Sequence, residues 1–149
     1  MTPNLHNDFN FFVMRKQFLR IGSLLGMLAV ALGAFGSHGL KGFVTPEAQA
    51  IFATGVQYHF YHALAVVAVG VLLHIRITRW LEVAGWLFVI GIVLFSGSLY
   101  LLTFQDVMFE FPKAFVGPIT PLGGLFFMAG WVFLFASTYQ TSSKGLDGR

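Results

Sequence analysis

Four long apolar segments alternate with short polar connections along the chain. The apolar segments cover about residues 18–38, 46–74, 80–103 and 121–139. A transmembrane helix needs about 20 consecutive apolar residues to cross the hydrocarbon layer of a membrane. Only helices and closed barrels satisfy their backbone hydrogen bonds in lipid, so uncharged segments of this length predict membrane-spanning helices. The predicted fold class is therefore all-α, an integral membrane four-helix bundle.

The segments outside this pattern are predicted to be peripheral. Residues 1–16 are polar and aromatic without a clear period, and are expected to form an N-terminal tail or a surface helix. Residues 17–140 form the predicted membrane domain, and residues 141–149 form a polar C-terminal tail. The connector at 104–119 is rich in phenylalanine, so we expect it to lie on the membrane surface or to fold back over the bundle.

Two Thr-Pro pairs mark predicted helix starts, at Thr45-Pro46 and Thr120-Pro121. A threonine hydroxyl can cap the first free N–H groups of a helix, and proline fits the first helical position. A helix from Pro46 to His74 would be about 43 Å long, which exceeds the hydrocarbon thickness of about 30 Å. Its first turns are therefore expected in the headgroup region.

Composition restricts the class of protein. Charged residues make up 10% of the 149 residues, against about 25% in soluble domains, and 56% of the residues are hydrophobic. There is no cysteine, which excludes disulfides, thiolate metal sites and cysteine nucleophiles. The formal charge is +3, but the basic residues do not form a stripe along any predicted helix. No nucleic-acid partner is therefore predicted. The expected partner is the lipid bilayer.

The positions of the basic residues predict the orientation. Seven of the nine lysines and arginines fall on one side of the predicted membrane domain. They are Arg15, Lys16, Arg20, Arg76, Arg79, Lys144 and Arg149. Only Lys41 and Lys113 fall on the other side. Lysine and arginine favour the cytoplasmic side of a membrane, so both termini are predicted to be cytoplasmic.

Small residues recur along the first predicted helix. They are Gly22, Gly26, Ala29, Gly33 and Gly36, at spacings that place them on one helix face. Gly22 and Gly26 form a G-x-x-x-G unit, which lets two membrane helices approach closely. We therefore expect this face to pack against another helix, in a membrane-protein partner or a second copy of the chain. A cationic flank before an apolar run also describes a signal peptide, but a discarded signal has no use for such a face.

Polar side chains gather in the predicted outer half of the bundle, with contributions from all four helices. They are His38, Thr54, Gln57, Tyr58, His62, Ser96, Ser98, Tyr100 and Thr120. Thr54, Tyr58 and His62 are four residues apart and share one helix face. Unpaired polar groups in hydrocarbon cost several kcal/mol. This face is therefore predicted to point into the bundle.

Two interpretations of these polar residues stay open. They can form hydrogen bonds that hold the helices together. They can also form a site for a small ligand, lipid headgroup, quinone, metal or haem. His59 and His62 are three residues apart and offer two imidazoles, but no third metal ligand is evident, and nothing specifies axial haem ligands. No cofactor is predicted.

No catalytic pattern is found in the sequence. There is no phosphate-binding glycine loop, no G-x-S-x-G elbow and no H-E-x-x-H helix, and Glu82 lies only at a span boundary. We therefore expect a non-enzymatic protein. A minimal channel or carrier is a further alternative, although the inner half, packed with leucine, valine and phenylalanine, speaks against an aqueous path.

Four sequence blocks carry a resemblance to a known family. They are residues 31–38 (ALGAFGSH), 54–65 (TGVQYHFYHALA), 93–100 (VLFSGSLY) and 119–124 (ITPLGG), the last leading to Ala129-Gly130-Trp131. Together they resemble the YgdD-like family of small inner-membrane proteins, relatives of transmembrane protein 256, over about residues 20–138. The resemblance implies four membrane helices and a bacterial inner-membrane location, with no established activity.

One residue departs from the family pattern. His59 stands where a glutamine-like residue is usual, which weakens the two-imidazole metal site. The candidate ligand site therefore moves to His38, Tyr58 and His62. With the glycine face and the lack of catalytic motifs, the sequence predicts an accessory or assembly protein of the inner membrane.

Overall fold

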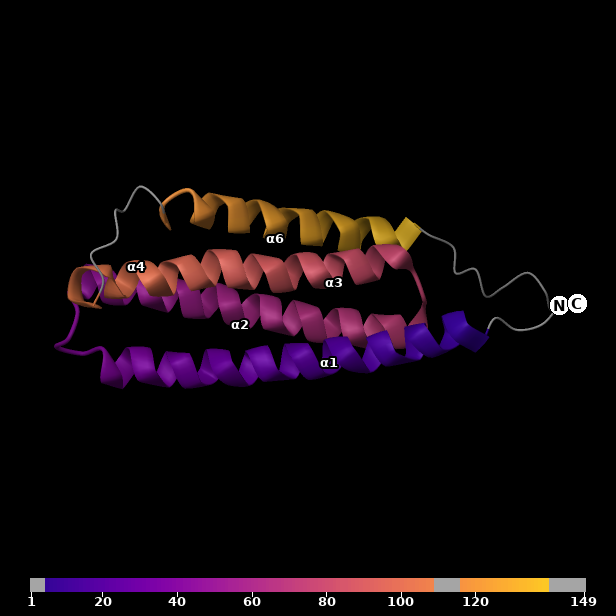
Figure 1. Ribbon diagram of the computed structural model, residues 1–149, viewed down its shortest axis with the longest axis horizontal. Coiled ribbons are helices and arrows are strands. Elements are labelled where there is room, and N and C mark those ends of the chain that lie inside the picture. Colours follow the sequence, from indigo (N-terminus) through magenta and orange to yellow (C-terminus); the bar gives the residue numbers. More distant parts are fainter. Residues whose placement is uncertain (1–4, 109–115, 140–149) are drawn as a thin grey trace, which may run out of the picture.

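The computed structural model describes residues 5–108 and 116–139 as a bundle of long helices (Figure 1). The helical elements are α1 (Leu5–Ala34), the π-helix η1 (Phe35–Gly39), α2 (Pro46–Ile75), α3 (Arg79–Gly91), the π-helix η2 (Ile92–Ser96), α4 (Gly97–Met108), α6 (Ile119–Ala136) and the 3₁₀ turn η3 (Ser137–Tyr139). The described ranges contain no β-strand.

Four helical stretches are long and apolar enough to cross a membrane. They are Lys16–Gly39, Pro46–Ile75, Arg79–Gln105 and Ile119–Tyr139. The third combines α3, η2 and α4, which follow one another without a break. The predicted all-α, four-helix membrane fold is therefore confirmed. The start of α1 and the end of α6 lie at the same end of the bundle (Figure 1), as an even number of spans requires.

The peripheral segments are described only in part. Helix α1 begins at Leu5 and runs unbroken into the first span, so residues 5–16 extend that helix. Helix α4 continues to Met108, past the start of the expected phenylalanine-rich connector. The middle of that connector and the C-terminal tail at 141–149 lie outside the described residues.

The two Thr-Pro pairs behave differently. Thr45 caps α2 as predicted, because its Oγ1 accepts a hydrogen bond of 3.2 Å from the Ala48 N–H. The prediction that Thr120 caps the last helix is wrong. Helix α6 begins at Ile119, two residues earlier than predicted, with Pro118 at the cap position and no side-chain cap. The Thr120 hydroxyl instead bonds to another helix, as described below.

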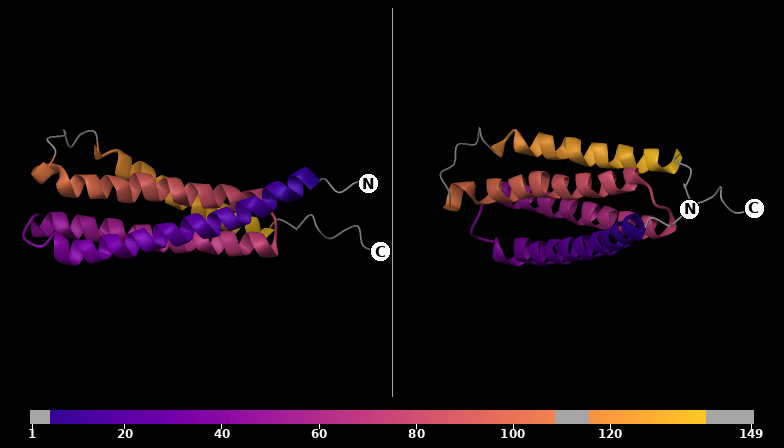
Figure 2. Two further views of the ribbon diagram at one scale, coloured as in Figure 1. Left: turned by 60° about the horizontal axis from the view of Figure 1, so that its bottom comes forward. Right: turned by 45° about the vertical axis from the view of Figure 1, so that its right-hand side comes forward.

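The central helices are α2 and α3–α4, with α1 packed along α2 and α6 packed along α3 (Figures 1 and 2). All four spans contribute to one hydrophobic core. Its buried residues are Phe18, Ala65, Val66, Val69, Leu73, Leu81, Ala84, Phe88, Ile92 and Phe127. Helix α2 supplies four of these ten residues, more than any other element, and the other helices assemble on it.

Glycines on α1 allow its close approach to α2. A Cβ atom added at Gly22 would lie 2.7 Å from a Val67 methyl carbon and 2.8 Å from the Val67 backbone nitrogen. Added at Gly36, it would lie 2.8 Å from the Phe52 ring, and at Gly33 it would lie 3.3 Å from Val56. No atom lies within 4 Å of the same position at Gly26. Three of the four predicted packing glycines thus face α2 of the same chain, and Gly26 does not.

The pair Gly22 and Gly26 provides a test of this packing. Gly22→Ala should lower the free energy of unfolding in detergent by about 1–3 kcal/mol, because the new methyl group overlaps the Val67 backbone. Gly26→Ala is the matched control and should leave stability unchanged or raised, since alanine is the better helix former. Thermal or denaturant unfolding measures both variants, and equal destabilisation would contradict the arrangement.

Candidate functional site

His62 lies at the centre of a cluster of aromatic rings between α2, α3 and α6. Its side chain is only 5% exposed. The imidazole stacks on Phe127, with ring centroids 3.5 Å apart and an interplanar angle of 9°. Phe88, Trp131 and Tyr58 complete the surroundings, with ring centroids 5.7, 6.2 and 6.0 Å from the imidazole. The ring is therefore held from several helices at once.

Both ring nitrogens of His62 are used in hydrogen bonds. Nδ1 lies 2.7 Å from the Tyr58 carbonyl oxygen, and the Trp131 indole N–H donates to Nε2 over 3.3 Å. A carbonyl only accepts and an indole N–H only donates, so the proton of the neutral ring must sit on Nδ1. No lone pair is then left for a metal or haem, and the ring instead links α2 to α6.

His59 faces a different neighbour. It is 4% exposed, and its Nδ1 lies 3.2 Å from the Tyr100 hydroxyl on α4. The imidazole of His59 thus lies against α4 and that of His62 against α6. Within the described part of the chain, no group of three or more potential metal ligands is found.

Two buried polar atoms near this site lack a hydrogen-bond partner among the described residues. They are Nε2 of His59 and Oγ of Ser96, which is 0% exposed. Ser96 ends the π-helix η2, which packs against α2. Buried polar groups are normally satisfied by protein or by ordered water. The interior of the bundle therefore has spare hydrogen-bonding capacity at His59 and at Ser96.

Hydroxyl groups also form hydrogen bonds between the helices. Ser98 donates to the Phe95 carbonyl over 2.8 Å, so Thr120 must donate the 2.7 Å bond that joins the two hydroxyls. This bond connects α4 to α6. The Thr103 hydroxyl shares its proton between the Leu99 carbonyl of its own helix, at 2.9 Å, and the Ala48 carbonyl near the start of α2, at 3.3 Å. Four predicted residues therefore take part in hydrogen bonds between helices, namely His62, Ser98, Tyr100 and Thr120.

Thr54 does not point into the bundle, and the prediction that it does is wrong. Gln57, another member of the predicted polar cluster, also lies on the surface. Both are exposed on α2. Thr54 bonds back to the Ala50 carbonyl of its own helix, and Gln57 donates to the Tyr61 hydroxyl over 2.9 Å. Tyr58 lies at the edge, with 40% of its surface exposed and its ring against Phe95. Of the predicted Thr54, Tyr58 and His62 face, only His62 is buried.

His38 lies apart from the other candidate ligand residues. It is exposed within η1, which the Gln49 amide joins to α2 through a 3.1 Å bond to the Gly36 carbonyl. From Gln49 to His62, α2 rises about 20 Å. The predicted set of His38, Tyr58 and His62 is therefore not brought together.

Three residues that join the helices were not among the predicted polar residues. Phe127 and Trp131 form the α6 side of the His62 cluster, and Thr103 forms a bond between helices. Phe127 and Trp131 are four residues apart and so share one helix face. That spacing was available in the sequence as a signal.

The fold, together with the His62 cluster and the hydrogen bonds between helices, identifies the chain as an integral membrane protein. Its four helices are joined by buried polar and aromatic contacts. Residues 32–124 match the family described as "Protein of unknown function (DUF423)". The chain belongs to this family, whose relatives carry the name UPF0382 membrane protein. The resemblance to YgdD-like proteins is thereby confirmed.

Relatives match over most of their length. UPF0382 membrane protein YwdK of Bacillus subtilis is 42% identical over 120 residues, or 80% of this chain and 93% of the relative. UPF0382 membrane protein SH2409 of Staphylococcus haemolyticus is 40% identical over 127 residues, 84% and 97% of the two chains. UPF0382 inner membrane protein YgdD of Escherichia coli is 34% identical over 135 residues, 90% and 98%. No solved structure matches the chain.

Replacing His62 and His38 in turn should distinguish a buried structural histidine from an exposed one. His62→Ala should lower the free energy of unfolding by about 2 kcal/mol or more, because it removes a buried ring and two hydrogen bonds. His38→Ala should change it by less than about 0.5 kcal/mol, since the side chain is exposed. Unfolding in detergent measures both, and equal effects would contradict the burial of His62.

The proton position on His62 can be observed directly. The two hydrogen bonds require a neutral ring protonated at Nδ1. In protein labelled with ¹⁵N-histidine at neutral pH, the nitrogen shifts of His62 should be those of this tautomer. Trp131→Phe removes the donor to Nε2, so it should move the Nε2 resonance. A spectrum showing the Nε2–H tautomer would rule out the described bonds.

Proposed function

We propose that this protein is a non-enzymatic accessory or assembly protein of the bacterial inner membrane. It would bind a transmembrane helix of another membrane protein, one that carries hydrogen-bonding side chains. The observation that carries the proposal is a strip of exposed polar residues on the lipid-facing side of α2. We define this α2 strip as Thr54, Gln57, Tyr58 and Tyr61.

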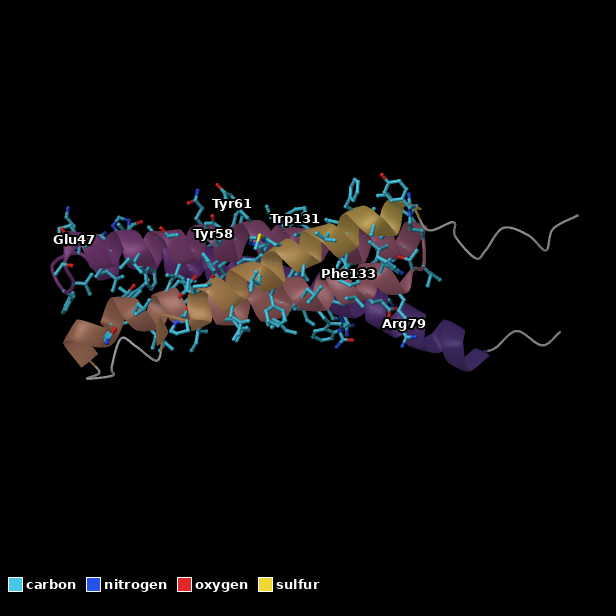
Figure 3. The ribbon with its side chains drawn as sticks, turned by 90° about the horizontal axis from the view of Figure 1, so that it is seen from above. Glu47, Tyr58, Tyr61, Arg79, Trp131 and Phe133 are labelled. Atoms are coloured by element: carbon cyan, nitrogen blue, oxygen red, sulfur yellow. The ribbon has the colours of Figure 1, made fainter. Side chains whose placement is uncertain are left out.

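The α2 strip lies on one side of the helix and within the membrane. Its positions follow the spacing of one helix face. The strip begins about 12 Å and ends about 22 Å from the start of α2, which spans Pro46–Ile75. Tyr61 is 53% exposed and points away from the bundle (Figure 3). With the first turns of α2 in the headgroup region, the strip extends from the edge of the hydrocarbon layer at Thr54 to about 10 Å inside it at Tyr61.

Lipid cannot satisfy the hydrogen-bonding groups of the α2 strip. The Gln57 amide donates one bond to Tyr61. An amide has two N–H donors and an acceptor oxygen, so this single bond leaves most of the Gln57 capacity unused. Polar groups without partners in an apolar medium cost a few kcal/mol each. A partner helix with polar side chains would remove this cost and gain about 0.6–2 kcal/mol per hydrogen bond.

The accessory role is favoured over catalysis or cofactor binding. Both nitrogens of His62 are engaged within the protein, which leaves this buried ring to hold helices together. The glycine face of α1, expected to bind a partner, is instead occupied by α2 at Gly22, Gly33 and Gly36. The partner surface is accordingly assigned to the α2 strip.

Location and sidedness follow from charge and from the relatives. The E. coli relative is named an inner membrane protein, and we extend that location to this chain. Lys16, Arg20, Arg76 and Arg79 are carried by the parts of α1, α2 and α3 nearest the end of the bundle where α1 starts (Figure 1). Basic residues favour the cytoplasmic side, which supports cytoplasmic termini.

Site-specific photocrosslinking in native membranes tests the proposal. A benzophenone amino acid is placed at Tyr61 in the α2 strip, and in a matched variant at Val71, an exposed apolar position on the same helix. We expect a covalent adduct with another membrane protein from Tyr61 and none from Val71. Adding Gln57→Leu to the Tyr61 variant should reduce the adduct several-fold, because the polar contact is lost.

The adduct supports the proposal only if crosslinking from the partner protein also captures this chain. A crosslinker placed in the contacting helix of the captured protein should label this chain. An adduct of two copies of this chain would show self-association and overturn the accessory role. The absence of a protein adduct, or equal adducts at Tyr61 and Val71, would equally overturn it.

A further inference from the structure

A cleft opens where the C-terminal parts of α2 and α6 meet the first turn of α3. Its volume is about 320 Å³. It is lined by Leu72, Arg76, Leu81, Trp131, Leu134, Phe135, Ser137 and Thr138. The cleft lies at the C-terminal end of α2, whereas η1 and His38 come before the start of that helix, so the cleft is separate from the α2 strip.

The walls and mouth of the cleft differ in chemistry. Leucines from three helices form its apolar walls, and the exposed rings of Trp131 and Phe135 flank it. The half-buried Arg76 comes directly after the end of α2 and supplies the single charge among the lining residues. Tryptophan and arginine at a helix end are typical of the boundary between hydrocarbon and headgroups.

Among the residues that the structure describes, the guanidinium group of Arg76 has no ion pair or hydrogen bond, and only the Arg76 backbone N–H is bonded, to the Leu72 carbonyl. Arg79 differs, because its charge interacts with Glu82 on the same helix. Arginine presents several N–H donors in one plane, an arrangement that fits the oxygens of a phosphate group. Arg76 is thus available to an anionic group at the mouth of an apolar cleft.

We propose that this cleft binds one anionic phospholipid. Its phosphate contacts Arg76, and one acyl chain lies along Leu72, Leu134 and Trp131. Basic pockets between membrane helices are suited to anionic headgroups. None of the eight lining residues is acidic, so the lining has no carboxylate to pair with the ammonium group of a zwitterionic lipid. Charge complementarity therefore selects the anionic class.

The size of the cleft fits this occupant. Small-molecule sites usually measure about 300–1,000 Å³. At about 320 Å³, the cleft holds the glycerol region and the upper part of one chain, while the rest of the lipid stays in the bilayer. The Ser137 and Thr138 hydroxyls donate to the Leu134 and Phe135 carbonyls, so they fix the end of the helix and leave phosphate binding to Arg76.

Native mass spectrometry of the full chain in detergent, with added lipid, tests the proposal. Phosphatidylglycerol should bind the wild-type protein more tightly than phosphatidylethanolamine does. Arg76→Gln should weaken phosphatidylglycerol binding by about fivefold, which is the contribution of one basic residue near a lipid phosphate. Arg79→Gln is the matched control. It removes a charge from the same end outside the cleft and should leave binding within twofold.

A second variant tests the apolar walls. Leu134→Trp fills the cleft and should reduce the number of lipids retained, provided that its unfolding curve matches the wild type. Three results would overturn the proposal. They are phosphatidylglycerol binding that Arg76→Gln leaves unchanged, equal losses in Arg76→Gln and Arg79→Gln, and equal affinity for both lipids. The crosslinking at Tyr61 is independent of all three results.

Discussion

The stack of His62 on Phe127 is the contact on which the bundle depends. Helix α6 packs chiefly along α3, so its connection to α2 rests on side chains. One imidazole supplies that connection twice, through its face to Phe127 and its Nε2 to Trp131. Its Nδ1–H donates to the Tyr58 carbonyl of α2 itself and so fixes the orientation of the ring. In a membrane no water competes for these bonds, and leaving either nitrogen unpaired would be costly. The ring therefore fixes both the spacing and the rotation of α6.

The polar residues of α2 divide into two groups with different consequences. His59 and His62 point inward and find partners on α4 and α6. Thr54, Gln57 and Tyr61 point outward, where lipid offers no partner. The inward group accounts for the assembly of the four helices. The outward group adds nothing to that assembly, and this is why we assign it to the recognition of another membrane protein.

The two proposed surfaces use opposite ends of α2. The α2 strip lies toward the start of the helix, and Arg76 lies just beyond its end. Helices α2 and α6 contact one another only through side chains, and the cleft lies between their C-terminal ends. The proposed lipid would occupy this cleft. The same open arrangement thus leaves α2 exposed to a partner on one side and admits a lipid at one end. Neither surface needs a catalytic group.

Much of the architecture follows from the sequence. The number and type of the spans, the Thr45 cap and the family membership are all local, since they depend on the length of apolar runs, on one hydroxyl and on short motifs. The direction in which a polar helix face points is not local. A stripe such as Thr54, Tyr58 and His62 faces a neighbour or the lipid according to where the other helices stop, and α6 covers only His62. For the same reason, only the tertiary structure decides that Thr120 bonds to Ser98. It also decides that α2 packs closely against Gly22 and makes no such contact at Gly26.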